Sequence, residues 1–272
     1  MEARRGDQYL AWDPDLGGRL TSWRIGEMEL LAHHGDHPVE FGMYPMAPWA
    51  GRVRNNEISL RNLRRMGIDA HGPVELHVNY APWALHGTCF TSPVDTMEVH
   101  EDTVISRQRV PNWPWPLELI STWHIRDDGF DVSVTVKADQ PSPVIVRWHP
   151  WFRRTVEGSS AHWSVDSATM AVRDGAFASG EWRDIVEAEG PYDDAFNVPS
   201  KRVNITWPGV ISLSVQSSHP WFVIFDQADD AICVEPQTQI PNAWIDPVAG
   251  EAEVARPGVD VHLETKWRWR LL

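Results

Sequence analysis

The stretch LELISTWHIRDDGFDVSVTV, residues 117–136, carries the clearest structural signal in this sequence. After the turn-forming residues 127–129, apolar side chains alternate with polar ones at Phe130, Val132, Val134 and Val136. Strict alternation is typical of a β-strand that buries one face and exposes the other. The segment 117–125 supplies the strand before the turn, so the stretch predicts a β-hairpin.

Two further segments show the same alternation. Residues 203–207 alternate into the turn Pro208-Gly209, and residues 211–215 alternate out of it, which predicts a second hairpin. The period continues from Val259 to Leu271 near the end of the chain. The one plausible helix, Glu181 to Ala188, is too short to be stable alone. We therefore predict an all-β protein with few short helices.

No linker, low-complexity tract or fixed-period repeat divides the 272 residues. All-β folds of roughly 200–250 residues commonly form one domain. We expect a single domain over residues 1–272, built as a sandwich or barrel of antiparallel strands. Cys89 and Cys233 are too few for a disulfide framework, so both are expected to be buried thiols.

The net charge of −14 argues against a nucleic-acid partner, because such binding depends on lysine and arginine side chains that neutralise phosphates. No segment reaches the roughly 18 apolar residues of a membrane span, and MEARRGDQYLAWD lacks the apolar core of a signal peptide. We expect a cytoplasmic protein with no nucleic-acid or membrane partner. Whether it is a monomer or a homodimer stays open.

Several common functional motifs are absent from the sequence, including a glycine-rich phosphate loop, G-x-S-x-G and H-E-x-x-H. The histidines at 33, 34 and 37 lie in a polar segment with no predicted helix to align them, which indicates a loop rather than a metal site. We expect no metal and no cofactor.

Three ionisable residues follow apolar, strand-like segments. His149 in VIVRWHPWF and Glu235 in AICVEPQT each precede a proline, and His86 in WALHGT precedes a glycine. A strand end holds a side chain firmly while letting it face a cleft. Two imidazoles and one carboxylate can serve as general acid and base without a metal or a nucleophile. Pro236 is expected to end its strand.

The motifs resemble the aldose 1-epimerase, or galactose mutarotase-like, family over nearly the whole chain. The similar segments, in family order, are LGGRLTSWRIGEMELL, YPMAPWAGRVRNNEI, LHVNYAPWALHG, VRWHPWF, PYDDAF, CVEPQTQIPNA and ARPGVDVHLETKWRW. The resemblance implies a large antiparallel β-sandwich with a sugar cleft across one sheet. It also implies an isomerase that interconverts the α and β anomers of a small-molecule aldose.

The resemblance implies a role for each matching residue. Glu235 would take the proton of the anomeric hydroxyl, His149 would protonate the ring oxygen, and His86 would hydrogen-bond near that oxygen. Arg52 and Asp193 would bind sugar hydroxyls. We expect His149 to be protonated and Glu235 ionised in the resting site, because their attraction favours that state. Asp194, next to Asp193, is expected to be a turn residue.

The sequence departs from the family pattern at a few positions. Gly51 stands where an asparagine usually precedes the arginine, and Trp151 stands where a phenol ring is common. A second His-Gly pair, His71-Gly72, competes with His86-Gly87, but the LHVN just upstream favours His86. These departures leave the preferred sugar open.

Two alternative functions fit parts of the pattern. A hexose-6-phosphate 1-epimerase would use the arginines between positions 52 and 65 for the phosphate, although the negative net charge would slow an anionic substrate. A non-catalytic carbohydrate-binding protein would use the 16 tryptophans equally well. A paired acid and base, Glu235 and His149, favours the enzyme, because a binding protein does not need them.

Overall fold

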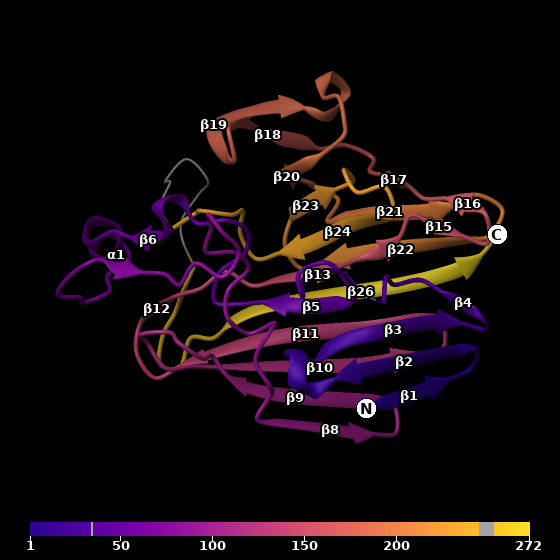
Figure 1. Cartoon of the computed structure of the whole chain (residues 1–272), viewed down its shortest axis with the longest axis horizontal. Coiled ribbons are helices and arrows are strands. Elements are labelled where there is room, and N and C mark those ends of the chain that lie inside the picture. Colours follow the sequence, from indigo (N-terminus) through magenta and orange to yellow (C-terminus); the bar gives the residue numbers. More distant parts are fainter. Residues whose placement is uncertain (34, 245–252) are drawn as a thin grey trace.

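The structure is a computed structural model that describes residues 1–33, 35–244 and 253–272. In these residues two large antiparallel sheets pack face to face (Figure 1). The helical elements of the described residues are α1 (Leu60–Arg65) and three short 3-10 turns at Pro14–Leu16, Arg54–Asn56 and Ile185–Glu187. The predicted all-β sandwich is confirmed.

The first sheet holds the residues of the candidate site. Along its main path the described strands follow one another as β1 (Glu2–Arg5), β2 (Gln8–Asp13), β3 (Arg19–Ile25), β5 (Met43–Met46), β13 (Arg147–Pro150), β24 (Ala231–Gln237), β23 (Trp221–Phe225), β20 (Asp193–Asn197), β18 (Thr169–Asp174) and β19 (Phe177–Asp184). Two short strands pair at its side, β14 (Phe152–Arg153) with β24 and β4 (Met28–Glu29) with β3.

The second sheet covers the inner face of the first. Its described strands run in the order β17 (His162–Ser164), β21 (Arg202–Trp207), β22 (Ile211–Ser217), β26 (Val261–Leu271), β11 (Gly129–Ala138), β10 (Leu117–Arg126), β9 (Thr103–Arg109) and β8 (Thr96–His100). Small two-stranded pairs complete the structure: β6 (Glu57–Ile58) with β7 (Val74–Glu75), β12 (Ser142–Pro143) with β25 (Val254–Ala255), and β15 (Thr155–Val156) with β16 (Ser159–Ser160).

The alternating segments form the hairpins that their sequence predicts. β10 pairs with β11 and β21 pairs with β22, and the apolar residues of β11 are buried while the intervening residues are not. Aromatic rings from the two sheets pack against each other between the inner faces. The ring centroids of Trp23 on β3 and Phe130 on β11 lie 4.7 Å apart, and those of Trp123 on β10 and Trp148 on β13 lie 5.0 Å apart. The buried apolar side chains of both sheets form one cluster. This packing makes the first sheet a rigid support for the residues on its other face.

The helix expected at Glu181–Ala188 is wrong. Residues up to Asp184 belong to strand β19, and only a 3-10 turn, Ile185–Glu187, follows. β19 pairs with β18, placing Trp182 opposite Ala171, where the ring packs against the core. Pairing to a neighbouring strand therefore overrides a weak local helix preference.

The expectation that Pro236 ends its strand is also wrong, because β24 continues to Gln237. On one side β24 pairs with β23 from Cys233 to Gln237. On the other side it pairs with β13 at Gln237–Arg147 and with β14 at Ile232–Phe152, and no pairing is present between these two positions. Proline has no N–H to donate to a ladder. Pro236 therefore lies inside β24, paired with Phe222 of β23, at a position where the β13 side of the strand has no ladder partner.

The predictions for the cysteines and for the histidine-rich loop have different outcomes. Cys89 and Cys233 are buried and unbonded, as predicted. His33 and His37 lie in loops, whereas residue 34 lies outside the described residues. Among the described residues, α1 and the 3-10 turns are all far too short to span a membrane.

Candidate active site

His149 and Glu235 meet on the outer face of the first sheet. His149 Nε2 lies 3.7 Å from Glu235 Oε1, and both residues are buried and line one pocket. Arg147 of β13 is paired with Gln237 of β24, and Phe152 of β14 is paired with Ile232 of the same strand, in one common register. Extending this register to the residues between the two pairs places His149 opposite Glu235. The gap in the ladder thus lies where the two side chains face each other.

The imidazole of His149 is held between two aromatic rings. Tyr44, its partner on β5, stacks at 5.1 Å and 30°, and Trp151 stacks at 5.2 Å and 6°. Tyr44 is itself fixed by a 2.8 Å hydrogen bond from its hydroxyl to Val39 O. Rings on both sides leave the histidine little rotational freedom, so its nitrogens keep a fixed direction.

His86 reaches the same pocket from a loop, not from the strand end that its sequence indicated. The backbone φ of His86 is +60°. The centroid of its ring lies 5.0 Å from the centroid of the His149 ring, and the two ring planes are at 88° to each other. The next residue, Gly87, has a φ of +77°, and a Cβ there would lie 2.0 Å from Ala47 O, so only glycine fits. Asn79 accepts from Leu85 N at 2.8 Å, which fixes the loop just before the histidine.

Arg52 and Asp193 are brought together as a pair. Arg52 Nη1 lies 3.0 Å from Asp193 Oδ2, and both side chains remain partly exposed. Asn242 holds the arginine loop by donating to Arg52 O at 2.7 Å and accepting from Arg54 N at 3.0 Å. The pair has hydrogen-bonding capacity left for a polar ligand.

Asp194 is not the turn residue that we expected. It belongs to β20, is buried, and accepts from Arg173 Nε of β18 at 2.6 Å. Burial raises the pKa of its carboxyl, against the opposing effect of Arg173 and the Asp193 N–H. Asp194 therefore anchors Arg173 at the pocket wall.

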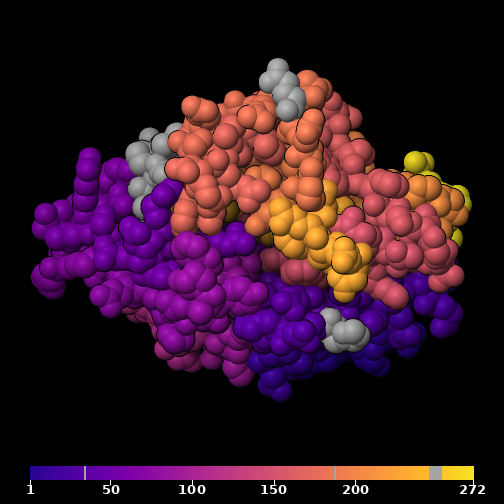
Figure 2. Space-filling model, turned by 45° about the horizontal axis from the view of Figure 1, so that its top comes forward, coloured from indigo at the N-terminus to yellow at the C-terminus, as the bar shows by residue number. Residues whose placement is uncertain are grey.

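One pocket of about 240 Å³ is lined by the ionisable residues described above: Arg52, His86, His149, Arg173, Asp193, Asp194 and Glu235. Its other walls come from the β18–β19 hairpin, from β20 and β23, and from the loop after β24. In Figure 2 the orange region of β18 and β19 overhangs the purple segment that carries the two loops. The volume lies just below the usual 300–1,000 Å³ of ligand pockets, which suits a single small ring.

The charge states of the two central pocket residues differ from our expectation. Burial raises the pKa of Glu235 to about 7; Asp193 adds to the rise, whereas Arg147 and Arg52 oppose it. Burial lowers the pKa of His149 well below its usual value, and Arg147 and Arg19 lower it further. The expected imidazolium beside a carboxylate is therefore wrong for the resting site, because desolvation of the two buried groups outweighs their attraction.

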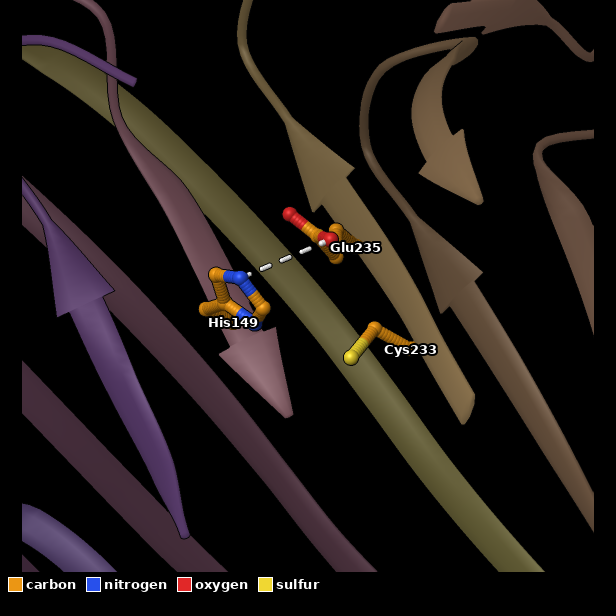
Figure 3. Close-up of side chains that lie close together, drawn as sticks. All are labelled: His149, Cys233 and Glu235. Atoms are coloured by element: carbon orange, nitrogen blue, oxygen red, sulfur yellow. Dashed lines mark ion pairs between the residues drawn. The ribbon is translucent and has the colours of Figure 1, made fainter. Parts of the chain in front are cut away.

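Glu235, His149 and Cys233 lie close enough together to raise the question of a metal (Figure 3). Their candidate ligand atoms lie within 4.8 Å of one another. However, burial raises the pKa of the Cys233 thiol well above its usual value, and Arg147 Nε already lies 3.0 Å from Glu235 Oε2. A protonated thiol and a neighbouring cation suit acid–base chemistry better than metal binding.

Arg147 is the important site residue that the sequence analysis missed. It lies on β13 two residues before His149, is 2% exposed, and contacts both Glu235 and His86. A signal was present, since a lone arginine in the apolar run VIVRW shares a strand face with the histidine two positions on. His71 does not line the pocket, which supports the choice of His86.

Comparisons with known proteins agree with this architecture. The sequence model of the family described as aldose 1-epimerase matches residues 3–253. The chain therefore belongs to the aldose 1-epimerase family. No curated protein sequence matches it significantly.

Solved structures of galactose mutarotase-like proteins share the fold. A candidate aldose 1-epimerase from Escherichia coli K12 superposes with a TM-score of 0.81 at 17% identity, covering 100% of this chain and 98% of that one. A galactose mutarotase-like protein from Clostridium acetobutylicum gives 0.80 at 15% identity, with coverage of 100% and 95%. Galactose 1-epimerase from Lactobacillus acidophilus NCFM gives 0.76 at 11% identity, with coverage of 99% and 93%.

Proposed function

We propose that this protein is an aldose 1-epimerase that interconverts the α and β anomers of a neutral aldohexose. The observation that carries the proposal is the facing pair of His149 and Glu235 in a pocket sized for one sugar ring. Family membership supports the reaction class. Opening a cyclic hemiacetal needs one group to take the O1 proton and another to protonate the ring oxygen, and this pair supplies both.

The Glu235 carboxylate takes the proton of the anomeric hydroxyl. As the bond between C1 and the ring oxygen breaks and the C1=O1 double bond forms, His149 gives its proton to the ring oxygen. Rotation about the C1–C2 bond exposes the other face of the aldehyde, and closure returns both protons. Glu235 Oε2 and His149 Nδ1 have no hydrogen-bond partner among the described residues, which leaves polar atoms free for the sugar.

The pKa directions explain how the pair obtains its charges. With a pKa of about 7 for Glu235 and a lowered pKa for His149, the single proton of the pair resides on the glutamate before a sugar binds. Transfer across the 3.7 Å gap gives the carboxylate and the imidazolium that ring opening needs. A bound sugar favours this transfer, because its O1 hydroxyl then donates to an ionised acceptor.

The charges of the pocket favour a neutral sugar over a sugar phosphate. Each arginine that lines the described pocket lies beside a carboxylate that also lines it; the pairs are Arg52–Asp193, Arg147–Glu235 and Arg173–Asp194. Glu40 adds a further carboxylate to the lining. A phosphate would have to compete with these carboxylates for their arginines, whereas hydroxyls can bind to the pairs as they stand.

A sugar panel tests the proposal. Polarimetry should show that the protein accelerates mutarotation of freshly dissolved α-D-glucose or α-D-galactose, but not of the corresponding 6-phosphates. Acceleration with the 6-phosphates alone would contradict the neutral substrate. If no sugar in a broad panel of aldoses responds, while binding is detected by calorimetry, the protein binds carbohydrate without turnover and the catalytic proposal fails.

A further inference from the structure

Arg147 is a buried cation for which the ring-opening chemistry above has no direct use. Its side chain is 3% exposed, and it lies on the pocket floor two residues before His149. Removing a guanidinium from water is costly unless a partner compensates its charge. Its contacts therefore indicate what it does.

The strongest partner of Arg147 is the proposed base. Its Nε lies 3.0 Å from Glu235 Oε2, and its Nη1 lies 3.4 Å from Gln237 Oε1. The Nε–H itself is directed at Met46 Sδ, 3.4 Å away, and a thioether is a weak acceptor. The contact with Glu235 is thus an ion pair that leaves Oε2 able to accept a hydrogen bond from a ligand.

The second partner of Arg147 is His86. Its Nη2 lies 3.4 Å from His86 Nδ1, and Gly51 N donates to the same nitrogen at 3.2 Å. A guanidinium has no acceptor, so Nδ1 must accept from both donors and carries no proton. The proton of the neutral ring lies on Nε2, which becomes a hydrogen-bond donor for a ligand.

We infer that Arg147 is a positioning residue whose guanidinium keeps Glu235 available as a proton acceptor and fixes His86 as the Nε2–H tautomer. One side chain on β13 thereby sets the state of a residue on β24 and of a residue in a separate loop. The inference rests on the proposed function only where it assigns Glu235 and His86 a role in sugar ring opening.

The electrostatic effect of Arg147 has one direction throughout the site. It lowers the pKa of Glu235, of His149 and of His86. Other titratable or charged groups also face this cluster: Tyr44 on β5, Asp193 on β20, Cys233 on β24, Arg52 in its loop, and Arg19 on β3, which acts on His149. All of them remain when Arg147 is replaced, so its loss should raise the proton affinity of all three groups together.

Nuclear magnetic resonance of the unliganded protein tests this inference without relying on turnover. The Glu235 carboxyl carbon, assigned through Glu235→Gln, is followed against pH in wild type, Arg147→Met, Arg147→Gln and Arg147→Lys. An opposite charge at this distance typically lowers a carboxyl pKa by about 1 to 3 pH units. The Met and Gln variants should therefore raise the Glu235 midpoint by about that much, and the Lys variant by less.

A matched control is Arg173→Met, which removes another pocket arginine that pairs with Asp194 instead. It should leave the Glu235 midpoint unchanged. Nitrogen shifts of the His86 ring should show a single Nε2–H tautomer in wild type and a mixture in Arg147→Met and Arg147→Gln. If Arg147→Met does not fold, Arg147→Gln carries both readouts, since it keeps a polar side chain in the cavity.

The rate of mutarotation supplies an independent check. Loss of Arg147 should move both limbs of the pH profile to higher pH, whereas a merely structural defect would lower the rate equally at every pH. An unmoved Glu235 midpoint and an unchanged His86 tautomer in a folded, neutral Arg147 variant would overturn the inference. Expected resonance shifts in a protein that turns over no sugar would overturn the proposed function and leave the role of Arg147 standing.

Discussion

His149 on β13 and Glu235 on β24 face each other across a gap in the strand ladder, with Nε2 and Oε1 3.7 Å apart. Neighbouring strands normally use their backbone groups to pair with each other. Here β24 pairs with β23 on one side of Glu235 and Pro236 but shows no pairing with β13 on the other, and the pocket opens over the same positions. The core on the inner face of the sheet therefore holds the strands rigidly, and the two titratable groups project from the outer face into the pocket. Concerted proton transfer needs this arrangement.

The first prediction concerns the pH dependence of the rate. The active pair holds one proton in total, so kcat/KM should fall as the pH rises through about 7, where Glu235 loses that proton in the free enzyme. It should also fall at low pH, where His149 gains a second proton. Polarimetric rates between pH 4 and 9 check this. A rate that keeps rising above pH 8 would contradict a shared proton.

The second prediction concerns stability. The pKa of Glu235 in the folded protein, about 7, lies above the ordinary value of 4.5 for a glutamate, so the folded state binds the proton more tightly between these two pH values. The contribution of Glu235 to stability is therefore full below about pH 4.5 and is lost as the pH rises to about 7. Glu235→Gln, which cannot ionise, should become progressively more stable than wild type over that range, by on the order of 3 kcal/mol.

Urea unfolding of both proteins at pH 4.5, 6 and 8 measures this difference. If the difference in unfolding free energy between wild type and Glu235→Gln stays constant with pH, the pKa of the Glu235 carboxyl is not raised in the folded protein. Glu118→Gln makes the same substitution on β10 of the other sheet, outside the pocket, and serves as the control for folding.

The third prediction concerns sugar binding by the Arg52–Asp193 pair. Asp193→Asn removes the charge that pairs with Arg52 and one hydrogen-bond acceptor for the sugar. Loss of a hydrogen bond to a charged group costs about 1.5 to 3 kcal/mol, which corresponds to roughly 10- to 150-fold in kcat/KM. Steady-state kinetics should place most of the loss in KM. A loss confined to kcat would instead assign Asp193 to the chemical step.

The fourth prediction concerns the loop that positions His86. Gly87→Ala would place a Cβ 2.0 Å from Ala47 O, whereas Gly158→Ala, at a similar φ of +75°, meets no atom within 4 Å. The Gly158 variant should lose about 1 to 2 kcal/mol from backbone strain alone, and the Gly87 variant more than about 3 kcal/mol together with activity. Equal thermal shifts in the two variants would show that the loop is not tightly fixed.

The regular part of the fold could be predicted because its signals are local. Alternation at 130–136 and 203–215 is fixed by which face of each strand meets the core, and the structure places those residues as predicted. β19 could not be predicted in the same way, because its strand conformation depends on pairing with β18. The chain reversal at Gly175 becomes favourable only when β18 and β19 pair with each other in the folded sheet.

The site divides along the same line. The family motifs place Glu235, His149, His86, Arg52 and Asp193, and all five line one pocket. Their charge states were not predictable, because they depend on burial and on Arg147. The positive φ of His86 likewise depends on loop contacts made by Gly87 and Asn79. The sequence motifs therefore indicate which residues form the site, whereas burial and neighbouring charges in the folded protein set their protonation states.

The most direct test compares the mutarotation of freshly dissolved α-D-galactose catalysed by wild type, Glu235→Gln and Glu118→Gln, with circular dichroism as a check on folding. A positioned base contributes about 10²- to 10⁴-fold, so Glu235→Gln should lose that factor while Glu118→Gln keeps the wild-type rate. A folded Glu235→Gln protein that accelerates the rotation change as fast as wild type would contradict the account.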